Sequence, residues 1–259
     1  MYILKRFLLA SSAVLGFVSA ASAQADFQGL YVGGSVGGAI HRSTANTISS
    51  FSTSGYFAAS SVNLLTIAGR QRLNKDTFIG GVEGGYNRQN ESTVIGIETD
   101  YAALRMNASQ SNSANYTCVS CEGSSFTINQ SLKTRWLYTL RPRFGIASGR
   151  TLYYVTGGLA VTRLNYQESF SDNFETATGS AEFNKTKAGW IAGIGASVRL
   201  NPERWYVKGE YLYTAFGRTT ITSNNLTAFS PPTSFPANVF DHSVALHSHI
   251  LRGGVDYRW

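Results

Sequence analysis

Residues 134–147 read TRWLYTLRPRFGIA, and apolar and polar side chains alternate along this stretch. One set of side chains is Trp136, Tyr138, Leu140, Phe144 and Ile146, and the other is Arg135, Thr139, Arg141 and Arg143. A period of two residues is typical of a β-strand whose two faces meet different surroundings. The stretch therefore predicts a strand with one aromatic, apolar face and one basic face.

The same alternation recurs in seven other segments, at residues 29–40, 77–89, 93–105, 151–163, 187–200, 205–217 and 244–259. Tight turns at residues 90–92, 148–150 and 201–204 alternate with long polar connections at residues 41–76, 106–133, 164–186 and 218–243. Strict alternation of short turns and long loops is typical of transmembrane barrels. The sequence thus predicts an all-β fold: an eight-stranded antiparallel up-and-down transmembrane β-barrel with four long outer loops and short periplasmic turns.

The composition fits this fold better than it fits a helical membrane protein. The mean hydropathy is −0.10, because lipid-facing and lumen-facing residues of a barrel cancel in the average. The formal charge of +7 falls to +5 without Lys5 and Arg6, since residues 1–23 contain no acid. For an exported chain, we expect these basic residues to meet outer-membrane lipid and lipopolysaccharide rather than nucleic acid.

The N-terminus has the three parts of a secretory signal. Lys5 and Arg6 precede an apolar run at residues 7–18, and small residues at 21–23 suit a signal peptidase. A spanning helix needs about 20 apolar residues, so the run is short for a membrane anchor. We expect a signal peptide at residues 1–23, a barrel domain at residues 24–259 and a location in the cell outer membrane. Cleavage after Ala25 instead of Ala23 stays open.

Charged residues of both signs share the face opposite the aromatic one. Unpaired charges in a dry interior would cost several kcal/mol each, and eight strands leave a bore that side chains just fill. We therefore expect a plugged polar interior in which these charges form ion pairs. The expected lumen network is Glu83, Glu98, Asp100, Arg141, Arg143, Lys208, Glu210, Arg252 and Asp256.

Several short motifs, in this order and spacing, resemble a known family. They are GLYVGG at residues 29–34, VIGIETD at 94–100, TLRPRFG at 139–145, LYYVTGG at 152–158 and GGVDYRW at 253–259. Together they resemble the OmpA-like small outer-membrane β-barrel family, in its alphaproteobacterial form. The resemblance implies that the terminal aromatic, Trp259, is read by the outer-membrane assembly machinery. The family more often ends in Phe, and it more often has an acid where this chain has Ser197.

Cys118 and Cys121 lie in the second long connection with C-x-x-C spacing, which suits a redox pair or half a zinc site. No second pair and no nearby histidine completes a metal site in the sequence. Because an exported chain meets an oxidising compartment, we expect a structural disulfide, with metal binding or redox work as the alternatives.

His41, His242, His247 and His249 lie near the outer ends of the first and last strands. Closing a barrel pairs these two strands, so we expect the four imidazoles to gather at one point on the outer rim. Such a cluster would suit heme iron or a metal ion, and some relatives of the resembled family are reported as hemin binders. The alternative is that they are polar rim residues and that the chain has no cofactor.

The tripeptide at residues 247–249 also echoes the His and Ser of lipid A deacylase, itself a small barrel. Ser248 lies on the face opposite both histidines, so one strand cannot bring them together. We therefore expect no enzyme and no catalytic residues. The expected function is a structural outer-membrane barrel that displays surface loops. A narrow porin for small solutes and a surface heme-binding protein remain the alternatives.

Overall fold

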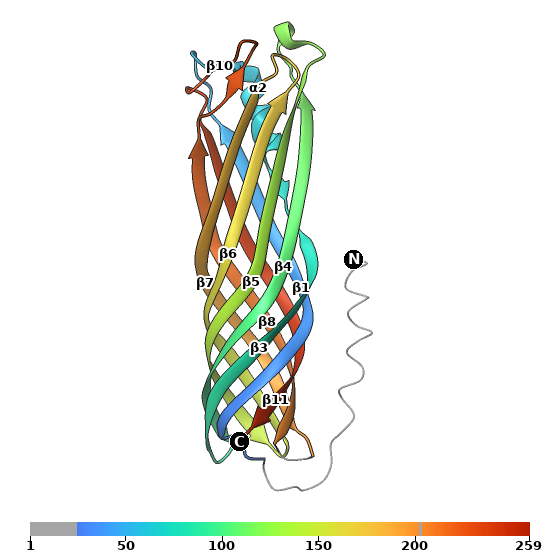
Figure 1. Ribbon diagram of the computed structural model, residues 1–259, viewed down its shortest axis with the longest axis vertical. Helices are drawn as coiled ribbons and strands as arrows, with labels where there is room; N and C mark the ends of the chain where they lie inside the picture. Colours follow the sequence, from blue (N-terminus) through green and yellow to red (C-terminus); the bar gives the residue numbers. More distant parts are fainter. Residues whose placement is uncertain (1–24, 202–203) are drawn as a thin grey trace.

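Long antiparallel strands close into a barrel in the computed structural model, which describes residues 25–201 and 204–259 (Figure 1). The ring runs in the order β1 (Gly29–Ser49), β3 (Lys75–Asn90), β4 (Thr93–Asn115), β5 (Ser125–Ser148), β6 (Thr151–Asp172), β7 (Thr178–Arg199), β8 (Trp205–Ser223) and β11 (Phe240–Arg258). It closes where β1 pairs with β11, from Tyr31 opposite Arg258 to Ser49 opposite Phe240. The predicted eight-stranded antiparallel barrel is confirmed.

The two ends of the barrel differ. We call the end that carries Trp259 and the three tight turns the turn end, and the opposite end the loop end. The short elements all belong to connections at the loop end: α2 (Ala59–Ala68), β2 (Gln71–Arg72), η1 (Val119–Cys121), β9 (Thr227–Ala228) and β10 (Thr233–Ser234) (Figure 1). Neither helical segment within the described residues has the length and apolar character needed to cross a bilayer.

An apolar belt surrounds the barrel next to the turn end. Its side chains point outward and are exposed, as the alternation predicted, with Val36 72 % and Phe78 90 % exposed. The belt includes Leu30, Val32, Ile97, Tyr101, Phe144, Tyr153, Val155, Trp190, Ile194, Val207, Tyr211 and Val255. An exposed apolar surface that runs around a whole barrel is the mark of contact with lipid hydrocarbon.

The strands reach further toward the loop end than the sequence predicted. The first strand was expected to end at Ile40 and the third at Arg105, but β1 continues to Ser49 and β4 to Asn115. Beyond the belt the outward side chains are polar, as at Ser109. The period of two persists there, but hydroxyl and amide groups outside and small residues inside make the hydropathy contrast weak. Much of the expected loops is therefore strand, and the β6–β7 connection spans only residues 173–177.

One strand of the ring is missing from the loop-end part of the wall. β3 begins only at Lys75, whereas its neighbours β1 and β4 both continue. Helix α2 contacts both neighbours, and β2 pairs with β1 through Arg72 and Thr44. The connection at residues 50–74 therefore completes the wall where β3 is absent.

The expected signal peptide at residues 1–23 lies outside the described residues, as does the expected cleavage position after Ala23, whereas the alternative position after Ala25 falls at the first described residue. The first described residues enter the barrel directly: Ala25 donates a backbone hydrogen bond to Gly149 in the β5–β6 turn.

Candidate functional site

The inward side chains near the turn end form a buried charge cluster centred on Glu98. Its carboxylate accepts hydrogen bonds from Tyr31 at 2.7 Å and from Arg143 at 3.1 Å. Arg141 and Lys208 also bind it, and the side chain of Arg141 is fully buried. Each of these side chains sits at an inward position of its strand, so the alternation that builds the belt outside also gathers the charges inside.

Lys208 connects opposite walls of the barrel. It lies on β8, four positions around the eight-stranded ring from β4, which carries Glu98. The Lys208 ammonium is 3.0 Å from Glu98 Oε2 and 2.9 Å from Glu83 Oε1. This ion pair therefore spans the full width of the bore.

A second part of the cluster lies beside the first. Arg252 binds Glu210 at 2.7 Å and Asp100 at 3.3 Å, while Arg141 binds Asp100 at 2.9 Å. Asp256 is buried beside them and interacts electrostatically with Lys208. All nine residues that the sequence singled out as lumen charges thus lie together inside the barrel.

Tyr154 was not among the expected site residues, yet it helps to hold the cluster. Its hydroxyl donates to Glu210 at 2.7 Å, and the Arg143 guanidinium stacks 3.7 Å above its ring. Gly195 lies directly opposite on β7, where a Cβ would come within 2.5 Å of the Tyr154 ring and hydroxyl. The sequence pattern places both residues on the lumen phase, but the register that pairs them is given only by the structure.

The position of Arg135 differs from the prediction that it belongs to the inward face of β5. The sequence placed it with Arg141 and Arg143, but its side chain is exposed on the outer wall. The pairing of β5 shifts between Lys133 and Leu137, and the shift breaks the alternation at this point. A register shift of this kind re-aims a side chain.

The turn end is closed by the segment that precedes β1. Phe27 is fully buried, and its backbone N–H donates to Gln89 at 2.7 Å. Arg258 binds the Phe27 carbonyl and lies 4.4 Å from the Tyr206 ring centroid. This end of the bore is therefore filled by protein groups.

Apolar side chains fill the middle of the bore, between the charge cluster and the loop end. They include Leu104, Met106, Leu132, Leu164, Phe216, Leu246 and Ile250. A polar layer follows, beyond the belt. There, Gln130 donates to Thr47 at 3.1 Å and to the carbonyl of Gly69, just after α2, at 2.8 Å.

Glu168 and His242 belong to the same polar layer, and both are buried. Burial raises the pKa of Glu168 to about 8 and lowers the pKa of His242 to about 4. The two imidazole nitrogens of His242 bond to the hydroxyls of Thr47, at 3.0 Å, and Ser223, at 2.9 Å. Near neutral pH both groups are therefore uncharged.

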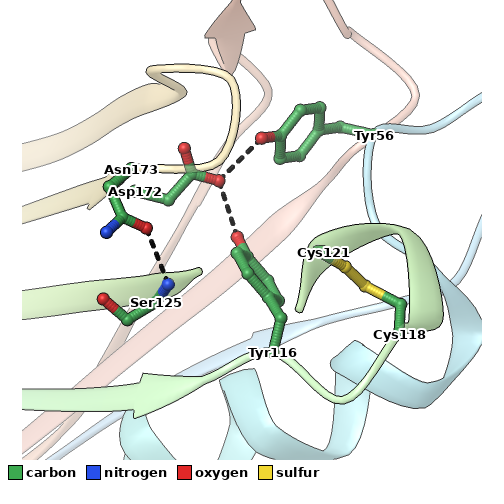
Figure 2. The surroundings of a disulfide bond; sticks show 7 residues. All are labelled: Tyr56, Tyr116, Cys118, Cys121, Ser125, Asp172 and Asn173. Carbon is green, nitrogen blue, oxygen red and sulfur yellow. Dashed lines mark hydrogen bonds between the residues drawn. A yellow bond between two sulfur atoms is a disulfide. The ribbon is translucent and has the colours of Figure 1, made fainter. Parts of the chain in front are cut away.

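An aromatic cap closes the loop end. Phe57, from the connection before α2, packs against Phe170 and Phe240 of the wall. Figure 2 shows the hydroxyls of Tyr56 and Tyr116 pointing at Asp172 from two different connections, and each donates to Asp172 Oδ2 at 2.7 Å. Burial and the bonds to Asp172 raise the pKa of both tyrosines, which keeps them protonated donors.

Cys118 and Cys121 are joined by a disulfide that lies beside this cap (Figure 2). Cys121 is buried within the aromatic cluster, whereas Val119 between the two cysteines is almost fully exposed. With both sulfurs bonded to each other, neither is a metal ligand in this structure.

The four histidines do not gather at one point, which corrects the expected rim cluster. His41 and His242 point into the barrel, while His247 and His249 point outward, where they bond to Tyr213 and Tyr211. Alternation along a strand puts odd-numbered and even-numbered residues of β11 on opposite faces. The four imidazoles therefore do not form a single ligand set for heme or a metal.

Two other constellations are already engaged in contacts with neighbouring side chains. Ser248 points inward and bonds to His41 at 2.7 Å, away from the outward His247 and His249. Carboxylate oxygens of Glu83, Glu98 and Glu210 lie within 4.8 Å of one another, as a cation site would require. The Lys208 ammonium lies within 3.9 Å of all three carboxylates, so a side-chain cation already balances them.

The chain matches a family model and is similar to several known proteins. The family model described as "outer membrane protein beta-barrel domain" matches residues 10–230. The chain is 30 % identical over 195 residues to the 31 kDa outer-membrane immunogenic proteins of Brucella melitensis and Brucella suis, covering 74 % of this chain and 71 % of each relative. Among solved structures it is similar to the outer membrane protein OprG of Pseudomonas aeruginosa, with a TM-score of 0.47, 12 % identity and coverage of 92 % and 99 % of the two chains. It is also similar to the outer membrane protease OmpT of Escherichia coli, with a TM-score of 0.43, 9 % identity and coverage of 94 % and 99 %.

Proposed function

Because this chain belongs to the outer membrane protein β-barrel domain family, we propose that it is a structural barrel of the outer membrane with a closed interior and displayed loops. The N-terminal signal at residues 1–23 directs its export and is removed. The apolar belt spans the bilayer, the turn end faces the periplasm and the loop end faces outward.

The ion pair between Lys208 and Glu98 carries the proposal of a closed interior. A bridge between opposite strands leaves no straight aqueous path through the charge cluster. The apolar layer and the aromatic cap lie in series with it, and Phe27 fills the turn end. A conducting porin needs a continuous water-filled lumen, which an eight-stranded barrel packed in this way does not provide.

The exposed residues of the barrel support two proposed partners, the outer-membrane assembly machinery and the lipid of the outer leaflet. Trp259 is exposed at the end of β11, where the outer-membrane assembly machinery can reach it during insertion. The outward residues beyond the belt contact the headgroups of outer-leaflet lipid and lipopolysaccharide. The cap, built from all four connections at the loop end, is the surface displayed to the exterior.

Single-channel recording in planar bilayers tests the proposal. The wild-type barrel should be electrically silent or open only rarely, whereas the E98A/K208A variant, which lacks the bridge, should open more often. The K75A variant changes an exposed lysine away from the charge cluster and should behave as the wild type does. Stable conductance by the wild-type barrel that falls with solute size would overturn the closed interior in favour of a narrow porin.

A further inference from the structure

The outward side of β5 and β6 carries a basic groove just beyond the apolar belt. The groove has a volume of about 500 Å³. Its charged lining residues are Lys133, Arg135 and Arg163, and the rest of the lining is Thr134, Trp136, Asn165, Gln167 and Asn184. We propose that this groove binds a phosphorylated glycolipid of the outer leaflet, with the phosphates of its sugar headgroup held by the three basic side chains.

The position of the groove determines which part of a lipid it meets. Trp136 forms the boundary, because it belongs to the last aromatic row of the belt and stacks on Tyr101 with ring centroids 6.1 Å apart. Tryptophan at the edge of a belt marks the headgroup level. The basic side chains follow directly beyond it, at the depth where a lipid carries its phosphate groups. The inference thus rests on the proposed placement in the outer membrane.

The local fold creates this cluster. The register shift between β5 and β6 turns Arg135 outward, although the alternation of β5 would have placed it inside. Arg105 of β4 is also exposed, at the matching register shift between β4 and β5. Two neighbouring irregularities of the wall therefore add cations to the same outer surface.

The electrostatics of the groove favour an anion. The described lining contains three basic residues and no acid. On the β1–β3 side of the barrel, by contrast, Arg42 is paired with Asp76 at 3.6 Å. The Arg163 Nε–H donates to Asn184 Oδ1 at 2.6 Å, and the planar guanidinium has further N–H groups that a phosphate could accept from.

A second groove continues toward the loop end and shares Gln167 with the first. It has a volume of about 640 Å³, and its lining includes Ser109, Ser111, Asn129, Ser131 and Ser169, together with the buried Glu168 and the exposed Glu182. Hydroxyl and amide groups are suitable partners for sugar hydroxyls. A phosphorylated sugar headgroup with further sugars attached would therefore contact both grooves. A simple phosphodiester lipid would occupy only the basic groove next to the belt.

Binding of purified bisphosphorylated lipid A to the full mature barrel in detergent, followed by native mass spectrometry, tests the inference. Dephosphorylated lipid A, phosphatidylglycerol and inorganic phosphate serve as comparison probes. We expect the wild type to retain bisphosphorylated lipid A and the K133A/R135A/R163A variant to bind it at least about tenfold more weakly, since three charge-assisted contacts are lost. Heat-modifiable migration on a gel shows that each variant is folded.

The matched control is R42A/K75A/R218A, which removes the same number of exposed cations elsewhere on the wall. Equal weakening in both triple variants, or equal retention of lipid A and phosphatidylglycerol by the wild type, would overturn the groove as a specific site. Capture of inorganic phosphate as tightly as lipid A would also overturn it. Conductance of the same wild-type preparation separates the two proposals, because a conducting barrel overturns the closed interior and leaves the lipid result standing.

Discussion

Glu168 Oε2 and His242 Nδ1 lie 3.9 Å apart inside the part of the barrel beyond the belt. Gln130, directly opposite Glu168 in the ladder, holds the Gly69 carbonyl at the end of α2. The Glu168 carboxyl group therefore lies next to the side chain that holds the segment completing the wall.

Raising the pH should loosen the connection at residues 50–74. Burial raises the pKa of Glu168 from 4.5 to about 8, so its stabilising contribution is complete below pH 4.5 and is lost as the pH rises to 8. Between pH 6.5 and 8, where His242 stays neutral, the opening equilibrium should increase by about tenfold per pH unit. Trypsin cleavage at Arg70 and Arg72, normalised to an unstructured peptide at each pH, measures this opening.

The E168Q variant removes the titrating group, and its cleavage should vary little between pH 6.5 and 8, where His242 stays neutral. E182Q changes an exposed acid on the outer face of β7 and should keep the wild-type profile. His242 has the opposite effect on stability. Its pKa is lowered from 6.5 to about 4, so its stabilising contribution is complete above pH 6.5 and is lost as the pH falls to 4. Identical profiles for the wild type and E168Q would contradict the assignment.

Replacing Lys208 by Met should destabilise the barrel by about 3–5 kcal/mol, because Glu83 and Glu98 then lose a buried cation. Urea unfolding in lipid vesicles, monitored by tryptophan fluorescence, measures the change. K75M removes an exposed lysine and should change the stability little. The double variant K208M/E98Q should recover part of the loss, and an additive double variant would argue against direct coupling.

Adding a methyl group at Gly195 should destabilise the barrel by about 1–3 kcal/mol, since the new Cβ would press on Tyr154 and its bond to Glu210. Gly209 is the matched position, because a Cβ there meets no other atom within 4 Å. G195A and G209A are compared by the same urea unfolding. Equal midpoints for the two variants would show that the Tyr154 contact adapts without strain.

Removing the Asp172 carboxylate should open the aromatic cap more than removing the disulfide does. D172A leaves the hydroxyls of Tyr56 and Tyr116 without their shared acceptor, which should raise cleavage at Arg70 and Arg72 by about tenfold. The disulfide joins residues only three apart and so closes a very short loop. C118A/C121A should therefore increase cleavage less than D172A does. The reverse order would show that the disulfide contributes more than Asp172 to keeping the aromatic cap closed.

The barrel itself could be predicted from the sequence because a membrane imposes a strong contrast between the two faces of every strand. The same contrast placed Lys208 and Glu98 on the lumen side. It did not predict their contact, since that depends on ring order and on the stagger between strands, which period-two patterns do not encode.

Beyond the belt the difference in hydropathy between the two faces of each strand becomes small, so the period of two residues no longer predicts where a strand ends. Water outside and small or polar groups inside gave no clear end to β1 and β4, and a helix at residues 59–68 was not expected within a Ser-rich connection. The outward Arg135 depends on a register shift, which no local preference reveals. A single rim cluster of histidines was expected, although parity alone indicates their separation, since His242 and His249 occupy opposite phases of one strand.

The extension of the strands past the belt raises the cap well above the lipid. From Arg163 to Asp172 β6 climbs about 25 Å at the tilt of a transmembrane barrel. The residues at the loop end are thus separated from the bilayer by a section of β-barrel whose outer surface is polar. Substitutions at the loop end should therefore have little effect on membrane insertion, because the belt that must fold into the lipid lies about 25 Å away.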